Sequence, residues 1–132
     1  MPVTQPARDG LRSAQTVFIV EDDTEFGAAL AELLADEGFR PVHFSSALKA
    51  LDSLAAELPS LIITDLLMPG MSGSQLVRTL RSDVRWRDIP IVVLTGGNDT
   101  AVGVRLDAPV VYKPDIESLL RILPAAAARA QS

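Results

Sequence analysis

One stretch, residues 61–73, constrains the fold of this chain more than any other. It begins with the apolar run Leu61-Ile62-Ile63-Thr64, whose β-branched content predicts a strand that is buried on both faces. The run ends on Asp65, and the Met68-Pro69-Gly70 sequence after it is typical of a turn. Open parallel sheets bind ligands at the carboxyl ends of their strands, so Asp65 is predicted to lie at such a site. Alternatively, a lone aspartate at this position would only cap the loop.

Three further apolar runs end on residues that can bind or react. The residues after these runs are Glu21-Asp22-Asp23 after 17–20, Thr95 after 91–94, and Lys113 after 110–112. Clustered carboxylates repel one another and are tolerated mainly where a divalent cation neutralises them. Oxygen ligands without a nearby His or Cys suit Mg²⁺. A lysine and a hydroxyl beside that ion suit an anion with several oxygens, such as a phosphoryl group.

This arrangement resembles the receiver domain of two-component response regulators, the CheY-like family. The residues that carry the resemblance are Val20-Glu21-Asp22-Asp23, Asp65-Leu66-Leu67-Met68-Pro69-Gly70-Met71-Ser72-Gly73, Leu94-Thr95-Gly96 and Lys113-Pro114. Each motif is weak alone, but all four stand in order and each follows a predicted strand. The resemblance covers roughly residues 16–123. It implies a flavodoxin-like three-layer α/β fold with a five-stranded parallel sheet of order 2-1-3-4-5 and the site at the switch point.

The resemblance also implies a role for each matching residue. Asp65 would accept a phosphoryl group from the phosphohistidine of a histidine kinase or phosphotransfer protein. Asp22 and Asp65 would bind Mg²⁺ directly, Glu21 would act through a water, and the main-chain carbonyl of Leu67 would complete the protein ligands. Lys113 and Thr95 would contact the phosphoryl oxygens. Such a domain is no enzyme towards other substrates, because it catalyses only its own phosphorylation and dephosphorylation.

Composition sets the class of protein and excludes several functions. The chain has 132 residues, enough for one domain with a proper core, and 48% of them are hydrophobic. Its net charge of −5 and the lack of a basic block argue against nucleic-acid binding. Cysteine is absent, which excludes disulfides and thiolate metal sites. No apolar stretch is long enough for a membrane span or a signal-peptide core, so we expect a cytoplasmic protein without a membrane partner.

The remaining chain alternates between strand and helix patterns. We expect a disordered leader over 1–15, a receiver domain over 16–124, and a tail over 125–132 that is either disordered or the end of the last helix. Helices are predicted over about 24–37, from Ser45 or Ser46 to 58, over 74–82 and over about 116–128, with a second strand over 39–44 near a sheet edge. Asp22, Asp23 or Thr24 would cap the first helix and Gly38 would end it. The predicted inward residues are Phe26, Leu30, Leu33, Leu34, Leu48, Leu51, Leu54, Leu76, Val77, Leu80, Ile116, Leu119, Leu120 and Leu123. His43, without a second His or Cys, is expected to be structural.

The segment between Thr95 and Lys113 is about one helical turn shorter than in typical receivers, since only 18 positions separate the two residues. We therefore expect the fourth helix to be shortened or absent. The shortening resembles a receiver subgroup named after a Phe-Ala-Thr-Gly-x-Tyr motif, although both aromatic residues are missing from this chain. Many receivers also have an aromatic residue three positions before the lysine, where this chain has Val110.

Two alternatives to a phosphorylated receiver are open. An Asp-nucleophile phosphatase also uses Mg²⁺ and a lysine, but would usually have a second acid where this chain has Leu67. A pseudo-receiver would lack Asp65 or the acid pair, and both are present. If the chain is a receiver, it is either a single-domain regulator or a module of a hybrid histidine kinase. We expect the single-domain regulator.

Overall fold

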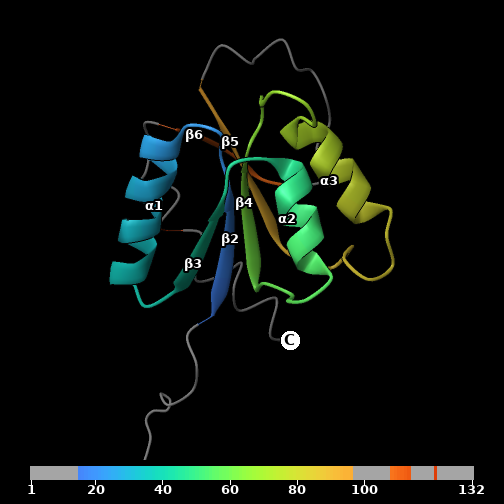
Figure 1. Ribbon diagram of the computed structural model, residues 1–132, viewed down its shortest axis with the longest axis horizontal. Helices are drawn as coiled ribbons and strands as arrows, with labels where there is room; N and C mark the ends of the chain where they lie inside the picture. The colour runs from blue at the N-terminus through green and yellow to red at the C-terminus, as the bar shows by residue number, and fades with distance from the viewer. Residues whose placement is uncertain (1–14, 97–107, 114–120, 122–132) are drawn as a thin grey trace, which may run out of the picture.

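The computed structural model describes residues 15–96, 108–113 and 121, and the fold is visible in these (Figure 1). Strands and helices alternate through residue 95. In chain order the elements are β2 (Thr16–Val20), α1 (Thr24–Asp36), β3 (Arg40–Phe44), α2 (Ala47–Leu54), β4 (Leu61–Asp65), α3 (Gly73–Arg81), β5 (Ile91–Thr95) and β6 (Val110–Tyr112). The alternation of short apolar strands with amphipathic helices produces an α/β domain, as the sequence predicts.

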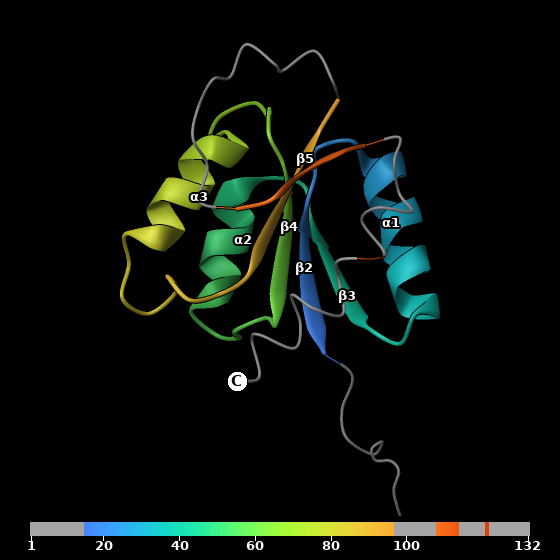
Figure 2. The same ribbon diagram turned by 180° about the vertical axis from the view of Figure 1, so that it is seen from behind.

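The five strands form one parallel sheet in the order β3-β2-β4-β5-β6. This is the predicted order 2-1-3-4-5, and β3 lies at an edge as expected. Helix α1 covers one face of the sheet, whereas α2 and α3 cover the other, which gives three layers (Figures 1 and 2). The central strand β4 is buried along its whole length, because it has neighbours on both sides and helices over both faces.

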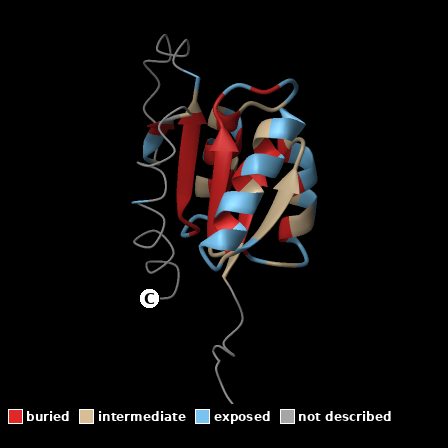
Figure 3. Cartoon of the chain, turned by 90° about the vertical axis from the view of Figure 1, so that its left-hand side faces the viewer, coloured by how far each residue is buried: buried red, intermediate tan, exposed pale blue. Residues whose placement is uncertain are grey.

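The core consists of two clusters, one on each face of the sheet. On the α1 face, Leu30 and Leu34 pack with Val17, Ile19 and neighbouring strand residues. On the other face, residues of α2 and α3 pack with strand residues that include Phe18, Ile62 and Val93. The buried strands and the half-exposed helices are apparent in Figure 3. The predicted inward residues Leu76, Val77 and Leu80 of α3 are all buried, which confirms that helix face.

Two predicted inward leucines are wrong. Leu33 on α1 is 39% exposed and Leu48 on α2 is 59% exposed. In α2 the residues that face the sheet are Ala47, Ala50 and Leu54, so Leu48 lies one position round the helix from that stripe. Helix α2 also ends at Leu54 rather than near residue 58. The chain beyond it turns to bring the Glu57 carboxylate to Thr16 and Arg40 at the ends of β2 and β3.

The ends of α1 follow the predicted signals, and α3 begins with a cap that the sequence analysis did not name. Asp23 caps α1 by accepting a hydrogen bond from the Phe26 amide at 3.1 Å, and Gly38 beyond its end has a φ of +96°. Ser72 caps α3, and its hydroxyl and the Gln75 side chain form a reciprocal capping box. These caps set where each helix leaves the rim of the sheet.

The edge strand β3 carries Pro41 on its outer side. The Arg40 amide donates to the Gln15 carbonyl and the Phe44 carbonyl accepts from the Glu21 amide, so alternate residues of β3 direct their backbone groups toward β2. Pro41 lies between such residues, and its missing N–H is therefore on the open side of the strand. The open edge of β3 therefore lacks one backbone N–H donor.

Several predictions concern segments that the structure does not describe. The shortened fourth helix between 97 and 107, residues 1–14 of the leader, the last helix apart from Arg121, and the tail over 125–132 lie outside the described residues. Within the described part of the chain, none of the helices has the length and apolar character that crossing a membrane requires.

Candidate functional site

The predicted site residues meet at one rim of the sheet because the parallel strands all end there. Glu21 and Asp22 follow β2, Asp65 ends β4, Thr95 ends β5, and Lys113 follows β6. The strand registers align these ends: Val20 pairs with Thr64, Asp65 with Leu94, and Thr95 with Tyr112. Residues that are far apart in the sequence are therefore neighbours at the rim, as predicted.

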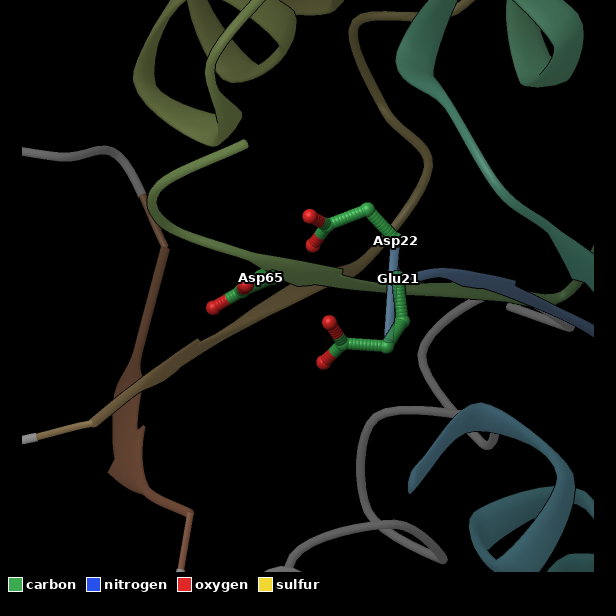
Figure 4. Close-up of side chains that lie close together, drawn as sticks. All are labelled: Glu21, Asp22 and Asp65. Atoms are coloured by element: carbon green, nitrogen blue, oxygen red, sulfur yellow. The ribbon is translucent and has the colours of Figure 1, made fainter. Parts of the chain in front are cut away.

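Three carboxylates gather at the centre of this rim (Figure 4). One oxygen each from Glu21, Asp22 and Asp65 lies within 4.8 Å of the other two. Glu21 and Asp65 are buried, whereas Asp22 is exposed. The close-up shows the three side chains reaching toward a shared space from the ends of β2 and β4. The cluster thus has a buried base and one side that is open to solvent.

Lys113 links two of these carboxylates. Its Nζ atom lies 2.9 Å from Oε1 of Glu21 and 3.4 Å from Oδ2 of Asp65. The ammonium group also lies 5.0 Å from the centre of the Phe26 ring on α1. A cation over an aromatic face is attracted by the ring electrons, so Phe26 helps to hold Lys113 over the acids.

Burial and charge shift the proton affinities of the cluster. Burial raises the pKa of Asp65, and the Asp22 charge adds to this, although the Lys113 ammonium opposes both. Burial likewise raises the pKa of Glu21, against the opposing pull of the Asp23 amide and Lys113. Burial alone would lower the pKa of Lys113, but the two carboxylates outweigh it and the pKa is raised. Three carboxylates face one ammonium among these residues, so the ionised site has an excess of negative charge.

The donor set fits a small divalent cation. It consists of carboxylate oxygens only, which Mg²⁺ prefers over softer ligands. Oxygen Oε2 of Glu21 accepts a hydrogen bond from the Asp23 amide at 3.1 Å. Oxygen Oε1 is shut off from solvent and accepts no well-formed hydrogen bond among the described residues, with only the Lys113 ion pair beside it. A bound cation would give this buried oxygen a second positive partner and would reduce the repulsion among the three carboxylates.

The loop after β4 is held against the site by a close backbone approach at Gly73. A Cβ atom at this position would lie 2.1 Å from the main-chain oxygen of Asp65. The Gly73 amide also donates to the Leu66 carbonyl at 2.8 Å. In the sequence, Gly73 is only the last residue of the motif that begins at Asp65, and its contact with Asp65 depends on a distance that the sequence does not show. Gly73 therefore belongs to the residues that position the site.

The other predicted residues have mixed outcomes. Thr95 is partly exposed, and its carbonyl accepts from the Lys113 amide at 2.7 Å. Leu67 extends its side chain into solvent, and the proposed role of its carbonyl stays a prediction. Val110, in the place of the usual aromatic residue, is 50% exposed. The side chain of Tyr112 lies outside the described residues, and so does most of the segment on which the subgroup assignment depends.

Comparisons with known proteins agree with this geometry. Residues 17–109 match the family model of the response regulator receiver domain. Over 100 residues the chain is 34% identical to hybrid signal transduction histidine kinase D from Dictyostelium discoideum, and over 95 residues it is 33% identical to the C4-dicarboxylate transport transcriptional regulatory protein DctD from Rhizobium meliloti. These matches cover 76% and 72% of this chain, but only 6% and 20% of the two relatives.

Solved structures give the same result. A sensor protein from Polaromonas sp. JS666 superposes with a TM-score of 0.80 at 29% identity, covering 88% of this chain and 98% of that one. The receiver domain of the sensor histidine kinase PA1611 from Pseudomonas aeruginosa PAO1 shares the fold, with a TM-score of 0.78 at 22% identity over 88% of this chain and 99% of that one. That structure contains a magnesium ion coordinated in its active site cleft. With its four motifs at one rim and this family match over most of its length, the chain belongs to the CheY-like response regulator receiver domains of two-component signalling.

Proposed function

We propose that this chain accepts a phosphoryl group on Asp65 from the phosphohistidine of a histidine kinase or phosphotransfer protein, and that the modification controls its signalling. The observation that carries the proposal is the cluster itself. Asp65 lies at the rim with the Lys113 ammonium 3.4 Å from its Oδ2 atom, and with Glu21 and Asp22 beside it. A nucleophile, a cation and an acid pair for a metal are the parts that phosphoryl transfer to a carboxylate needs.

Each residue has a role that follows from its position. An oxygen of Asp65 attacks phosphorus and forms a P–O bond while the P–N bond to the partner histidine breaks, and the electron pair leaves on the imidazole nitrogen. Lys113 pairs with a phosphoryl oxygen, because its ammonium already lies over the nucleophile. Thr95, at the end of the neighbouring strand, donates a hydrogen bond from its hydroxyl to another phosphoryl oxygen.

Mg²⁺ is the cofactor in this proposal, and Glu21, Asp22, Asp65 and the Leu67 carbonyl are the groups that would hold it. When bound, the ion screens the repulsion between the carboxylate and the phosphoryl oxygens. Support comes from the all-oxygen donor set and from the excess of carboxylates over the one ammonium of Lys113 among these residues. A structural neighbour of the same fold holds magnesium in its own cleft.

The product is an acyl phosphate that water later cleaves at phosphorus, which regenerates the Asp65 carboxylate. The domain acts on no other substrate in this proposal, so it is a switch and not an enzyme in the usual sense. A phosphatase of the Asp-nucleophile type is less well supported, because the position two residues after Asp65 is the apolar and exposed Leu67.

The setting of the domain is also part of the proposal. Relatives include both a hybrid kinase and a transcriptional regulator, so a histidine kinase is the expected partner class in either case. We favour a single-domain regulator in the cytoplasm, with a module of a hybrid kinase as the alternative. With a net charge of −5, the domain itself has little attraction for nucleic acid.

Intact-mass spectrometry tests the proposal. Incubation with Mg²⁺ and a small acyl phosphate should add the mass of one phosphoryl group, and hydroxylamine should remove it. Asp65→Asn should abolish the addition, whereas Asp52→Asn, on the exposed side of α2, should leave it unchanged. A mass increase that persists in Asp65→Asn would contradict the assignment of the acceptor. Transfer from a panel of phosphorylated histidine kinases would then identify the partner as the kinase that loses its label fastest.

A further inference from the structure

The ring of His43 reaches the main chain of the acid pair. His43 lies on β3, and its Nε2 atom is 2.8 Å from the main-chain oxygen of Glu21. A carbonyl oxygen can only accept a hydrogen bond, so Nε2 carries a hydrogen and donates it. Both the neutral tautomer with a hydrogen on Nε2 and the charged imidazolium satisfy this requirement.

The Glu21 carbonyl lies just past the end of the strand ladder. The last registered pair of β2 and β3 is Val20 with Phe44, and the Glu21 amide still donates to the Phe44 carbonyl at 2.9 Å. The next acceptor along β2 is the carbonyl of Glu21, a residue with no exposed surface. A buried carbonyl needs a donor, and the His43 ring supplies one where the ladder ends.

Helix α1 leaves space for this ring. A Cβ atom at Gly27 would lie 2.3 Å from Nε2 and 2.4 Å from Cε1 of His43, which is closer than any side chain tolerates. Gly27 is a buried residue in the first turn of α1, and glycine within a helix is normally unfavourable. The contact therefore depends on a specific residue on each of two elements and is not an incidental surface contact.

The bonded carbonyl belongs to the peptide unit that joins Glu21 to Asp22. Because the peptide is planar, fixing its oxygen fixes the rotation of the plane between the two Cα atoms, and with it the directions in which both side chains leave the backbone. The Glu21 amide is held by Phe44 and the Glu21 carboxylate by the Asp23 amide. His43 completes the set of contacts that hold this turn.

We propose that His43 is a positioning residue that orients the Glu21–Asp22 pair for a divalent cation, with Gly27 providing the space for its ring. The inference rests on the proposed function, because it concerns the same cation site. His43 touches neither the cation nor the phosphoryl group and acts through the Glu21 carbonyl alone. It has the role of an outer partner of a metal ligand, and changing such partners typically lowers metal affinity 10- to 100-fold.

Two substitutions at His43 separate the hydrogen bond from the packing. His43→Leu keeps much of the volume and removes the donor, whereas His43→Gln keeps an amide donor of similar reach. Thr16→Val, at the other end of β2, is the control for a loss of stability that does not involve the site. Mg²⁺ affinity is measured by calorimetry, and amide hydrogen exchange at Glu21, Asp22 and Asp23 is measured without any metal.

We expect His43→Leu to weaken Mg²⁺ binding roughly tenfold and to speed exchange at the three amides. His43→Gln should recover most of both properties, and Thr16→Val should leave both unchanged. The inference is overturned if His43→Leu alters neither property, or if His43→Gln loses as much as His43→Leu. If the wild-type protein neither binds Mg²⁺ nor becomes phosphorylated, the proposed function fails. In that case the amide exchange data alone test whether His43 orients the acid pair.

Discussion

Asp65 and Glu21 show how a reactive site opposes stability at the level of single residues. Both are buried acids whose pKa is raised, chiefly by burial, so the folded state disfavours their charged forms even with Lys113 beside them. An apolar residue at either position would give the domain a higher free energy of unfolding. The same unfavourable charge is what a bound cation would neutralise in the proposed function.

Replacing Asp65 by Asn should raise the free energy of unfolding at about pH 7. The folded pKa of Asp65 lies above 3.8, the ordinary value for an aspartate, so the unfolded state loses this proton first as the pH rises. The ionised Asp65 therefore costs stability above the folded pKa, and the neutral amide removes that cost. Well below pH 3.8 the Asp65 carboxyl is neutral in both the folded and the unfolded state, so the advantage of the variant should disappear.

Urea unfolding of Asp65→Asn and of the wild type over this pH range measures the difference directly. Asp52→Asn, at an exposed position of α2, serves as the control for removal of an acidic group. An advantage of Asp65→Asn that grows on acidification would have the wrong sign and would contradict the raised pKa.

At the scale of elements, the start of α3 is the part that most directly shapes the site. The capping box of Ser72 and Gln75 begins the helix, and Gly73 lets its first turn lie against the end of β4. The position of Asp65 therefore depends on a helix that contributes none of the reacting groups.

Gly73→Ala should lower the free energy of unfolding by about 1–3 kcal/mol, the usual cost of overpacking. It should also slow phosphorylation at Asp65, because the added Cβ would lie 2.1 Å from the Asp65 carbonyl and force the strand end to move. Gly96→Ala is the matched control, since a Cβ there meets nothing within 4 Å. Urea unfolding and a phosphorylation time course provide both measurements, and equal effects of the two substitutions would refute the steric argument.

The elements also show what the sequence alone could predict. The strand order could be expected only from the family resemblance, since nothing in the apolar runs themselves fixes which strands are neighbours. The meeting of Asp65, Lys113 and the acid pair was predictable, because each apolar run ends on its functional residue and parallel strands end at one rim. The faces of the helices were harder, and Leu33 and Leu48 were assigned to the wrong side. The contacts of Gly73 and of His43 with Gly27 could not be predicted, since they are set by the distance between packed elements and leave no periodic pattern.

For the whole molecule, the cation site links metal binding to folding. In the proposed function, Mg²⁺ binds the assembled rim and has no such site in the unfolded chain, where the acids are far apart. At a free concentration ten times its dissociation constant, it should stabilise the domain by about 1.4 kcal/mol.

Thermal unfolding at matched ionic strength, with and without Mg²⁺, measures this effect as a rise in Tm. Asp22→Asn should remove most of the rise, because Asp22 is the exposed member of the three-carboxylate cluster. A rise that is the same in wild type and Asp22→Asn would mean that Mg²⁺ acts elsewhere on the protein.

Pro41 has a consequence for how copies of this domain behave at high concentration. An open strand edge can recruit a strand from another copy, through a continuous row of backbone donors and acceptors. The outer side of β3 lacks a donor at Pro41, so a chain that added itself there would leave one of its carbonyls unpaired. The proline thus disfavours pairing of this edge with other copies into swapped dimers and fibrils. It lies two residues before His43, the residue that we propose orients the acid pair.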